Sequence, residues 1–220
     1  MTYEPKTKPK RVMHHRTASG QAQKAKTREL IIQSAIPVFA KHGPDSPVID
    51  DFVQAAGISR GTFYNYFQTT RELLDAAMAR LSDEVIATIV PVVEGEPNPV
   101  IRFASAARMY YRKATLDPLF GQFLGSVSSV GALAMEHAHA DLQEAMQAGF
   151  FKIQDMDLAE AVAFGVMVFS LRTAKAREGG DARALEVVRA ILSALGVDPT
   201  MIDLALSVPL PPFALREIPI

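Results

Sequence analysis

Residues 48–67, VIDDFVQAAGISRGTFYNYF, decide the fold of the first part of this 220-residue chain. Apolar residues recur at three- and four-residue steps on both sides of Gly57, as they do along one face of an α-helix. Ala55 and Ala56 are small enough to let two helices approach each other, and Gly57 gives the backbone freedom that a tight turn needs. The stretch therefore predicts two short helices joined by a turn, which is a helix-turn-helix unit.

The second of these helices, predicted over residues 60–66, carries side chains suited to reading DNA. In a helix-turn-helix protein this helix enters the major groove with its N-terminus first. Short or rigid polar side chains can bond phosphates and base edges, and Arg60 can pair bidentately with a guanine. A helical hairpin with no nucleic-acid role is the alternative. The candidate DNA contacts from this chemistry are Ser46, Ser59, Arg60, Gly61, Thr62, Tyr64, Asn65 and Tyr66.

Charge along the chain also favours a polyanion-binding front half. The formal net charge of -1 combines a basic and an acidic part. Residues 1–73 hold 11 Lys/Arg and 6 Asp/Glu, a balance of +5, whereas residues 74–220 hold 12 and 18, a balance of -6. Residues 1–24 show no apolar period and are expected to be a flexible basic arm. This arm either adds salt-sensitive affinity for the DNA backbone or is a solvated tail.

The rest of the chain predicts further helices, because no stretch shows strand alternation and no internal repeat is visible. We expect an all-α protein with an arm (1–24), a helix-turn-helix domain (25–85, motif 48–67) and a second helical domain (86–220). Candidate helices are 27–42, 47–56, 60–66, 70–90, 98–115, 117–128, 136–149, 157–177, 182–195 and 199–206. The expected N-caps of the second, third and fourth of these helices are Ser46, Ser59 and Thr69.

Composition and motif content exclude several classes of protein. There is no cysteine, so no disulfide or cysteine-ligated metal is possible. The densest apolar stretch, residues 161–171, is too short for a membrane span, which needs roughly 20 residues. His137 and His139 diverge around a helix and do not converge on one metal ion. No catalytic constellation, metal site or cofactor motif stands out, so we expect a non-enzymatic cytoplasmic protein.

Two late helices predict self-association. Residues 157–177 are apolar nearly all round, and residues 182–195 show two apolar stripes. One chain of this size cannot easily cover both faces of both helices, so a homodimer through these helices is expected. Such a dimer would present two reading helices to a palindromic double-stranded DNA site.

Two stretches resemble the tetracycline-repressor (TetR) family of bacterial transcription regulators. Residues 57–74, GISRGTFYNYFQTTRELL, are similar to its recognition-helix signature, and residues 27–43 to its first helix. Residues 142–165 resemble the link between its seventh and eighth helices. The resemblance adds Val48, Thr70 and Arg71 as candidate DNA contacts. Pro47 stands where the family usually has a phosphate-binding Thr, and Thr70 where it usually has Lys.

The resemblance also implies a C-terminal domain that encloses an apolar cavity for an inducer. Ordinary core packing is the alternative interpretation of the same residues. The candidate lining residues are Phe103, Ala107, Tyr110, Phe120, Phe123, Phe164 and Met167. The expected function is a homodimeric repressor relieved by a small apolar or amphipathic ligand. The alternatives are an activator, a ligand-independent regulator, a small-molecule-binding protein without DNA binding, and an enzyme with an unrecognised site.

Overall fold

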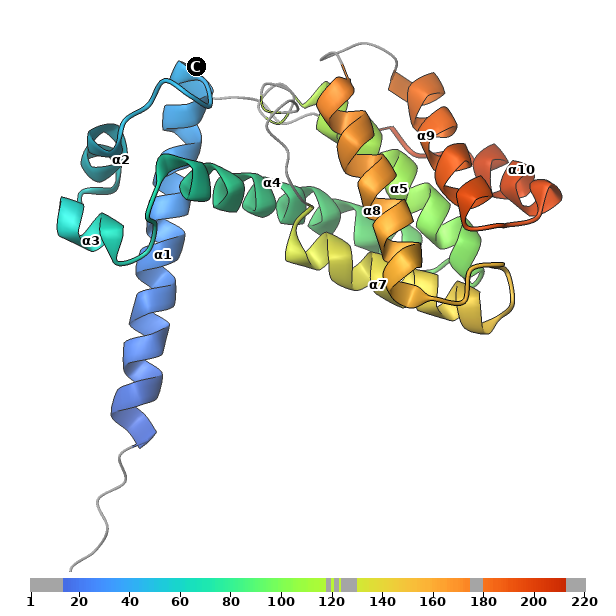
Figure 1. Cartoon of the computed structure of the whole chain (residues 1–220), viewed down its shortest axis with the longest axis horizontal. Coiled ribbons are helices and arrows are strands. Elements are labelled where there is room, and N and C mark those ends of the chain that lie inside the picture. Colours follow the sequence, from blue (N-terminus) through green and yellow to red (C-terminus); the bar gives the residue numbers. More distant parts are fainter. Residues whose placement is uncertain (1–13, 118–119, 121–122, 124–129, 175–179, 213–220) are drawn as a thin grey trace, which may run out of the picture.

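The computed structural model describes residues 14–117, 120, 123, 130–174 and 180–212, and within them every regular element is an α-helix (Figure 1). The all-α prediction is confirmed. The helices are α1 (His14–His42), α2 (Ile49–Ala56), α3 (Arg60–Tyr64), α4 (Thr70–Val93), α5 (Pro99–Leu116), α7 (Ala132–Gln147), α8 (Met156–Thr173), α9 (Gly180–Ala194) and α10 (Pro199–Ser207).

The first three helices pack around an aromatic core. Phe39 of α1 and Phe52 of α2 have ring centroids 4.8 Å apart, and Phe63 and Phe67 are also buried. Gly57 ends α2 in the left-handed region, with φ of 64°, where a side chain would be strained. The chain therefore turns sharply between α2 and α3, as the sequence predicted.

Helix α4 connects this N-terminal unit to the rest of the molecule (Figure 1). Its first half packs against α1, and an ion pair of 2.9 Å between Arg80 and Glu29 joins the two helices. Its second half packs against α5 and α7. A single helix, α4, consequently spans both parts of the chain.

Helix α5 forms the centre of the second part. It contacts α4, α7, α8, α9 and α10, and most of its side chains are buried. Asn98 caps its first turn by accepting from the N–H groups of Val100 and Ile101 at 2.9 and 3.3 Å, while Pro99 occupies the first helical position.

The predicted flexible arm is partly wrong. Helix α1 begins at His14, so residues 14–24 are helical rather than irregular. They include Ala22, Lys24 and other residues of high helix propensity, and they extend a helix already fixed by its buried half, so no new nucleus is needed. Residues 1–13 of the arm lie outside the described part of the chain.

The predicted start of the second helix also differs. Ser46 does not cap α2, because the helix begins at Ile49 with Val48 as its N-cap. The carboxylate of Asp51 accepts from the Val48 N–H at 2.8 Å and so satisfies that backbone group. Ser46 is exposed, and Pro47 is buried.

Several other boundaries shift. The predicted helices 136–149, 157–177 and 182–195 correspond to α7, α8 and α9. The prediction for 117–128 falls mostly on residues outside the described part of the chain. The apolar stripes of α9 do not need a second chain, since Val188, Ile191 and Leu192 are buried against α5, α8 and α10 of the same chain. Sequence periodicity alone cannot say how many neighbours a helix has.

Candidate nucleic-acid interface and ligand cavity

Helix α3 is held by its ends and by one buried ring. Ser59 is the N-cap: its Oγ accepts from the Thr62 N–H at 3.1 Å and lies 2.9 Å from the Thr62 hydroxyl. Phe63 is fully buried and packs edge-on against Tyr64, with centroids 5.8 Å apart. The cap and the buried ring fix which side chains of this short helix face outward.

The candidate DNA contacts lie largely on the outer surface of this unit. Tyr64 is 45% exposed, although it carries a large ring. Thr62, Tyr66 and Thr70 are half-buried, and the remaining candidates are exposed, namely Ser46, Val48, Ser59, Arg60, Gly61, Asn65 and Arg71. Rigid aromatic and short polar groups at the surface suit contacts with phosphates and base edges.

Arg60 forms a two-point ion pair with Asp50 of α2. Its Nε and Nη2 groups donate to the two carboxylate oxygens, each at 2.5 Å. Both side chains are more than half exposed. The hydrogen bond from Arg60 holds the pKa of Asp50 below its ordinary value, so the pair is charged at neutral pH. This contact could not be predicted from the sequence, because Asp50 and Arg60 lie in different helices.

A surface hollow lies between α1 and the end of α3. It is lined by Lys24, Ala25, Arg28, Asn65 and Tyr66. The Arg28 guanidinium lies 5.2 Å from the Phe67 ring centroid, a cation–π contact that positions it. Two cations and two polar tips here form a phosphate-compatible surface beside α3.

The start of α4 has the predicted cap. Thr69 Oγ1 accepts from the Glu72 N–H at 3.1 Å, and the Glu72 carboxylate accepts from the Gln68 N–H at 2.6 Å. Arg71 pairs with Asp75 at 3.3 Å. The Arg71 side chain is therefore exposed but engaged within its own helix.

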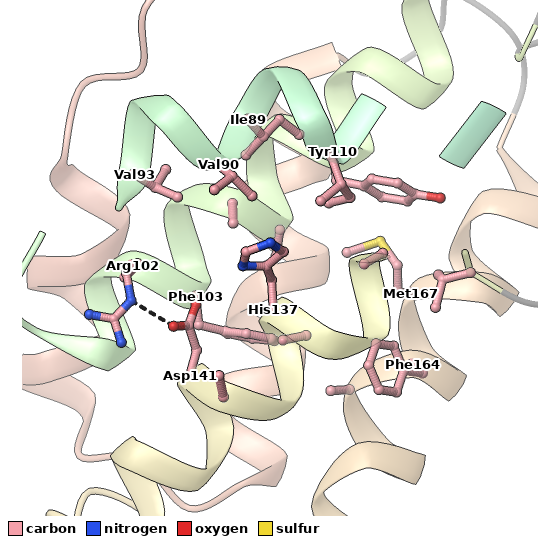
Figure 2. Close-up of a pocket in the computed structure, with 18 of the residues that line it drawn as sticks. Ile89, Val90, Val93, Arg102, Phe103, Tyr110, His137, Asp141, Phe164 and Met167 are labelled. Carbon is pink, nitrogen blue, oxygen red and sulfur yellow. Dashed lines mark hydrogen bonds and ion pairs between the residues drawn. The ribbon is translucent and has the colours of Figure 1, made fainter. Parts of the chain in front are cut away.

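The second part of the chain encloses a cavity of about 310 Å³ between α4, α5, α7 and α8 (Figure 2). Its walls are mainly apolar and include Ile89, Val90, Phe103, Phe164 and Met167. This volume is at the small end of the range for ligand pockets, about 300–1,000 Å³. The cavity therefore suits a compact ligand.

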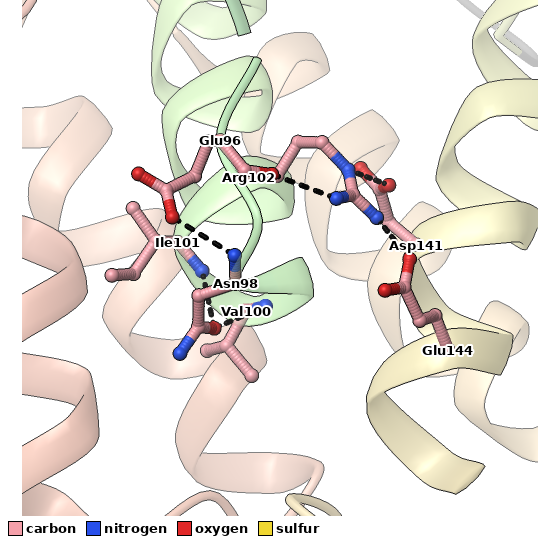
Figure 3. Close-up of polar contacts among 7 residues, drawn as sticks. All are labelled: Glu96, Asn98, Val100, Ile101, Arg102, Asp141 and Glu144. Atoms are coloured by element: carbon pink, nitrogen blue, oxygen red, sulfur yellow. Dashed lines mark hydrogen bonds and ion pairs between the residues drawn. The ribbon is translucent and has the colours of Figure 1, made fainter. Parts of the chain in front are cut away.

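One end of the cavity is polar (Figures 2 and 3). Arg102 donates to Asp141 at 2.6 Å, to Glu144, and to the Glu96 carbonyl at 2.8 Å. Burial raises the pKa of Asp141, and the hydrogen bond from Arg102 opposes that rise. His137 projects from α7 toward the cavity, one turn before Asp141 (Figure 2). This end of the cavity offers hydrogen-bonding groups, and the positive charge of Arg102 is already paired with the carboxylates of Asp141 and Glu144.

A buried hydrogen-bond chain ties the cavity wall to α4. The Tyr110 hydroxyl lies 2.8 Å from Ser82 Oγ, which also accepts from the Gly131 N–H at 2.9 Å. Asp83 accepts from the Leu133 N–H at 2.9 Å. A Cβ at Gly131 would lie 2.6 Å from the Ala79 carbonyl oxygen, so only glycine allows this close approach of α7 to α4.

The structure brings five of the seven candidate lining residues together around the cavity: Phe103, Ala107, Tyr110, Phe164 and Met167. Phe120 and Phe123 do not line it. They are buried elsewhere, Phe120 against Tyr110 and Phe123 against Phe39 of α1. Apolar residues look alike in sequence, and tertiary packing decides which wall each one joins.

The polar lining residues Glu94, Arg102, His137 and Asp141 were not among the candidates. The four-residue spacing of His137 and Asp141, which places both on one helix face, was the available signal. His139, by contrast, bonds Glu160 of α8 at 2.5 Å. Among the described residues, no group of three or more possible ligands gathers as a metal site, and no helix has the length and hydropathy to cross a membrane.

Two family descriptions match this chain. The family description "Bacterial regulatory proteins, tetR family" matches residues 31–77, and "Tetracyclin repressor-like, C-terminal domain" matches residues 98–202. Solved RolR structures are similar over nearly the whole chain. The complex with the ligand resorcinol is 26% identical, with a TM-score of 0.71, covering 88% of this chain and 100% of that one. The ligand-free form has the same TM-score at 27% identity and covers 85% of this chain.

Curated relatives match over shorter stretches. The uncharacterized HTH-type transcriptional regulator YvdT of Bacillus subtilis (strain 168) is 35% identical over 70 residues, 32% of this chain and 36% of that protein. The HTH-type transcriptional repressor KstR2 of Mycobacterium tuberculosis (strain ATCC 25618 / H37Rv) is 25% identical over 112 residues, 51% of this chain and 46% of that protein. The chain thus covers about a third to a half of these two relatives.

Helices α2 and α3 with the turn at Gly57, joined through α4 to a separate cavity of ligand size, have the architecture of a transcription regulator of the helix-turn-helix class. Both matched descriptions and the similar proteins are regulators, which indicates a regulatory rather than an enzymatic protein. The chain belongs to the TetR family of transcription regulators.

Proposed function

We propose that this protein is a homodimeric repressor that leaves its palindromic operator when a small neutral ligand fills the cavity between α4 and α8. In each half-site α3 enters the major groove. The bases and phosphates there are contacted by the exposed candidates of α2, α3 and the start of α4, with Lys24 and Arg28 supplying charge beside them.

The proposed dimer forms mainly through α8. This helix leaves Leu158 and Phe169 exposed, at 50% and 67%, and Val162 and Val166 half-buried. Large apolar side chains on one exposed helix are typical of an interaction surface. The exposed face of α9 carries charged residues such as Arg183 and Glu186, together with small side chains. The contribution of α9 to the proposed dimer interface is therefore polar.

The proposed effector is a compact aromatic or alicyclic compound with one or two hydroxyl groups. The apolar walls suit its ring, and His137 and Asp141 can bond its hydroxyls. An anionic ligand is disfavoured, because Glu94 and Asp141 are acidic and Arg102 is already paired. Resorcinol, the ligand in the similar RolR complex, is a neutral molecule of this kind and the first compound to test.

The main support for the proposal is that α4 belongs both to the proposed DNA-binding part and to the cavity wall. Its N-terminal half packs on α1 of the DNA-reading unit, and its Ile86, Ile89, Val90 and Val93 line the cavity. If DNA and ligand prefer different positions of α4, ligand binding weakens DNA binding by at most the ligand's own differential free energy for the two positions. The protein would act in the cytoplasm, where its operator lies.

The test begins with selection of bound sequences from random double-stranded DNA by the full-length protein. A palindromic motif is expected, and fluorescence anisotropy then measures its affinity with and without resorcinol and a panel of small phenols and cyclic alcohols. At least one compound should raise the melting temperature of the protein and weaken DNA binding. Absence of any selected motif would contradict the DNA-binding proposal, and a motif insensitive to every compound that binds would contradict the relief mechanism.

A further inference from the structure

The Asp50–Arg60 pair uses two of the hydrogen-bond donors of Arg60, the first residue of α3. A guanidinium carries five N–H donors. Asp50 takes the Nε–H and one hydrogen on Nη2, both at 2.5 Å. Three hydrogens remain, one on Nη2 and two on Nη1, and the edge between these two nitrogens does not face the carboxylate. One hydrogen from each of these two nitrogens forms a parallel pair of donors.

That free edge matches one base. Guanine presents two acceptors, O6 and N7, in the major groove, whereas adenine presents an acceptor beside a donor, and each pyrimidine presents a single polar group. Two parallel donors therefore satisfy guanine and leave at least one donor unpaired against each of the other bases. The carboxylate holds the guanidinium plane, so fewer side-chain rotamers are lost when the base is bound.

The absence of net charge on the Asp50–Arg60 pair also favours a role in base recognition. Asp50 is 59% exposed on its side chain and lies beside the reading helix, where an isolated carboxylate would repel phosphates. Paired with Arg60, it forms a unit without net charge, which adds little to non-specific attraction for the DNA backbone. A neutral pair on this surface serves base discrimination better than backbone affinity.

We propose that Asp50 is a specificity-determining positioning residue, which orients Arg60 to read one guanine in each half-site of the operator. Asp50 does not itself touch DNA in this arrangement. The inference rests on the proposed DNA-binding function, and it adds a residue of α2 to the determinants of the operator sequence.

The experiment repeats the selection from random DNA with the full-length wild type and the variants Asp50→Asn, Arg60→Lys and Asp45→Asn. Competition binding then compares guanine with the other three bases at the position that Arg60 reads. Asp45→Asn is the matched control, because it removes the same charge from another exposed site of the same unit. Circular dichroism verifies that each variant keeps the wild-type helix content.

We expect the wild type to prefer guanine at one fixed position by roughly 5- to 150-fold, the range for one good bidentate base contact. Asp50→Asn should lose most of this preference while binding random DNA as well as the wild type or better. Arg60→Lys should lose the preference with little change in the salt dependence, because lysine keeps the charge but lacks the planar fork. Asp45→Asn should keep the preference.

Three results would overturn the inference. Tighter binding by Asp50→Asn with an undiminished guanine preference would mean that Asp50 merely sequesters Arg60. Equal weakening on all sequences by Arg60→Lys, or a selected motif that lacks a fixed guanine, would mean that Arg60 contacts a phosphate. Failure of the wild type to select any motif would instead contradict the proposed function itself, so the two failures are distinguishable.

Discussion

The ring of Phe123 packs edge-on against that of Phe39, with centroids 6.3 Å apart and planes at 77°. Phe39 lies in α1 and contacts Phe52 of α2. Phe120, three residues before Phe123, packs against Tyr110 of the cavity wall, again at 6.3 Å. These aromatic contacts join the cavity wall to the N-terminal unit, helices α1 to α3, by a second route that is separate from α4.

Phe123→Ala should uncouple the two parts of the chain. Deleting a buried ring is expected to destabilise the protein by about 3 kcal/mol through lost contacts and a residual cavity. Since Phe39 loses one of its two aromatic neighbours, we expect the N-terminal unit to melt at a lower temperature than the rest. Differential scanning calorimetry checks this against the wild type and against Leu204→Ala, an exposed position on α10. A single transition at the wild-type temperature would refute the coupling role of Phe123.

Tyr110→Phe should weaken the connection between the cavity wall and α4 without emptying the core. The ring remains, and Ser82 keeps its bond from the Gly131 N–H, so the expected loss of stability is about 1 kcal/mol. In the proposed repressor, the variant should bind operator DNA but respond more weakly to an effector. Effector affinity and effector-induced DNA release are measured side by side; an unchanged release at unchanged effector affinity would exclude Tyr110 from the coupling.

The Tyr110 hydroxyl should also make the free energy of unfolding depend on pH in the alkaline range. Burial raises the pKa of Tyr110 from 10.0 to about 12. Between these values the unfolded chain loses the phenolic proton before the folded protein does, so the free energy of unfolding falls as the pH rises through this window. Urea unfolding at pH 9, 10 and 11 should show a steeper fall for the wild type than for Tyr110→Phe. Parallel curves for the two proteins would contradict the shift.

Phe169→Glu should disrupt the proposed dimer. Phe169 is 67% exposed on α8, and a carboxylate there would be desolvated and placed against its own copy at a two-fold interface. Analytical ultracentrifugation should show monomers at micromolar concentration, with weakened binding to a palindromic site. Leu204→Glu on α10 provides the control and should remain dimeric. A dimeric Phe169→Glu protein would place the interface elsewhere.

Ala107→Leu should fill part of the cavity. Ala107 lines the space beside Phe103 and Tyr110, so the added carbons occupy ligand volume. The variant is expected to keep operator affinity but to lose at least tenfold in effector affinity, measured by calorimetric titration. Ala148→Leu, at an exposed position after α7, is the control. Equal effector affinity in wild type and Ala107→Leu would show that the ligand binds outside this cavity.

The parts of the structure that sequence predicted depend on local interactions. Ser59 and Thr69 cap the helices expected of them, because a hydroxyl bonding an N–H three residues ahead needs no distant partner. Gly57 turns the chain for the same reason. The expected cap at Ser46 failed where two local solutions compete: the Asp51 carboxylate bonds the backbone instead.

Local interactions do not decide which buried residues line the cavity. Phe103 and Phe123 are both buried aromatic residues on predicted helices. Phe103 faces the cavity, whereas Phe123 packs against Phe39 of the N-terminal unit. Likewise Val188 and Leu192 of α9 are covered by helices of their own chain. The helical period gives the direction of a side chain around its own axis, not the neighbour that it meets.

The helical class, the turn at Gly57 and the short helix after it could be predicted from the sequence, because short-range hydrogen bonds and apolar spacing depend on consecutive residues. The family was predicted from the resemblance of residues 57–74 and 27–43. Three contacts became visible only in the folded structure: the ion pair of Asp50 with Arg60, the ion pair of Arg102 with Asp141, and the packing of Phe123 on Phe39. Each of these pairs joins residues from different parts of the fold, and such a contact exists only once helix packing has placed both side chains within bonding distance.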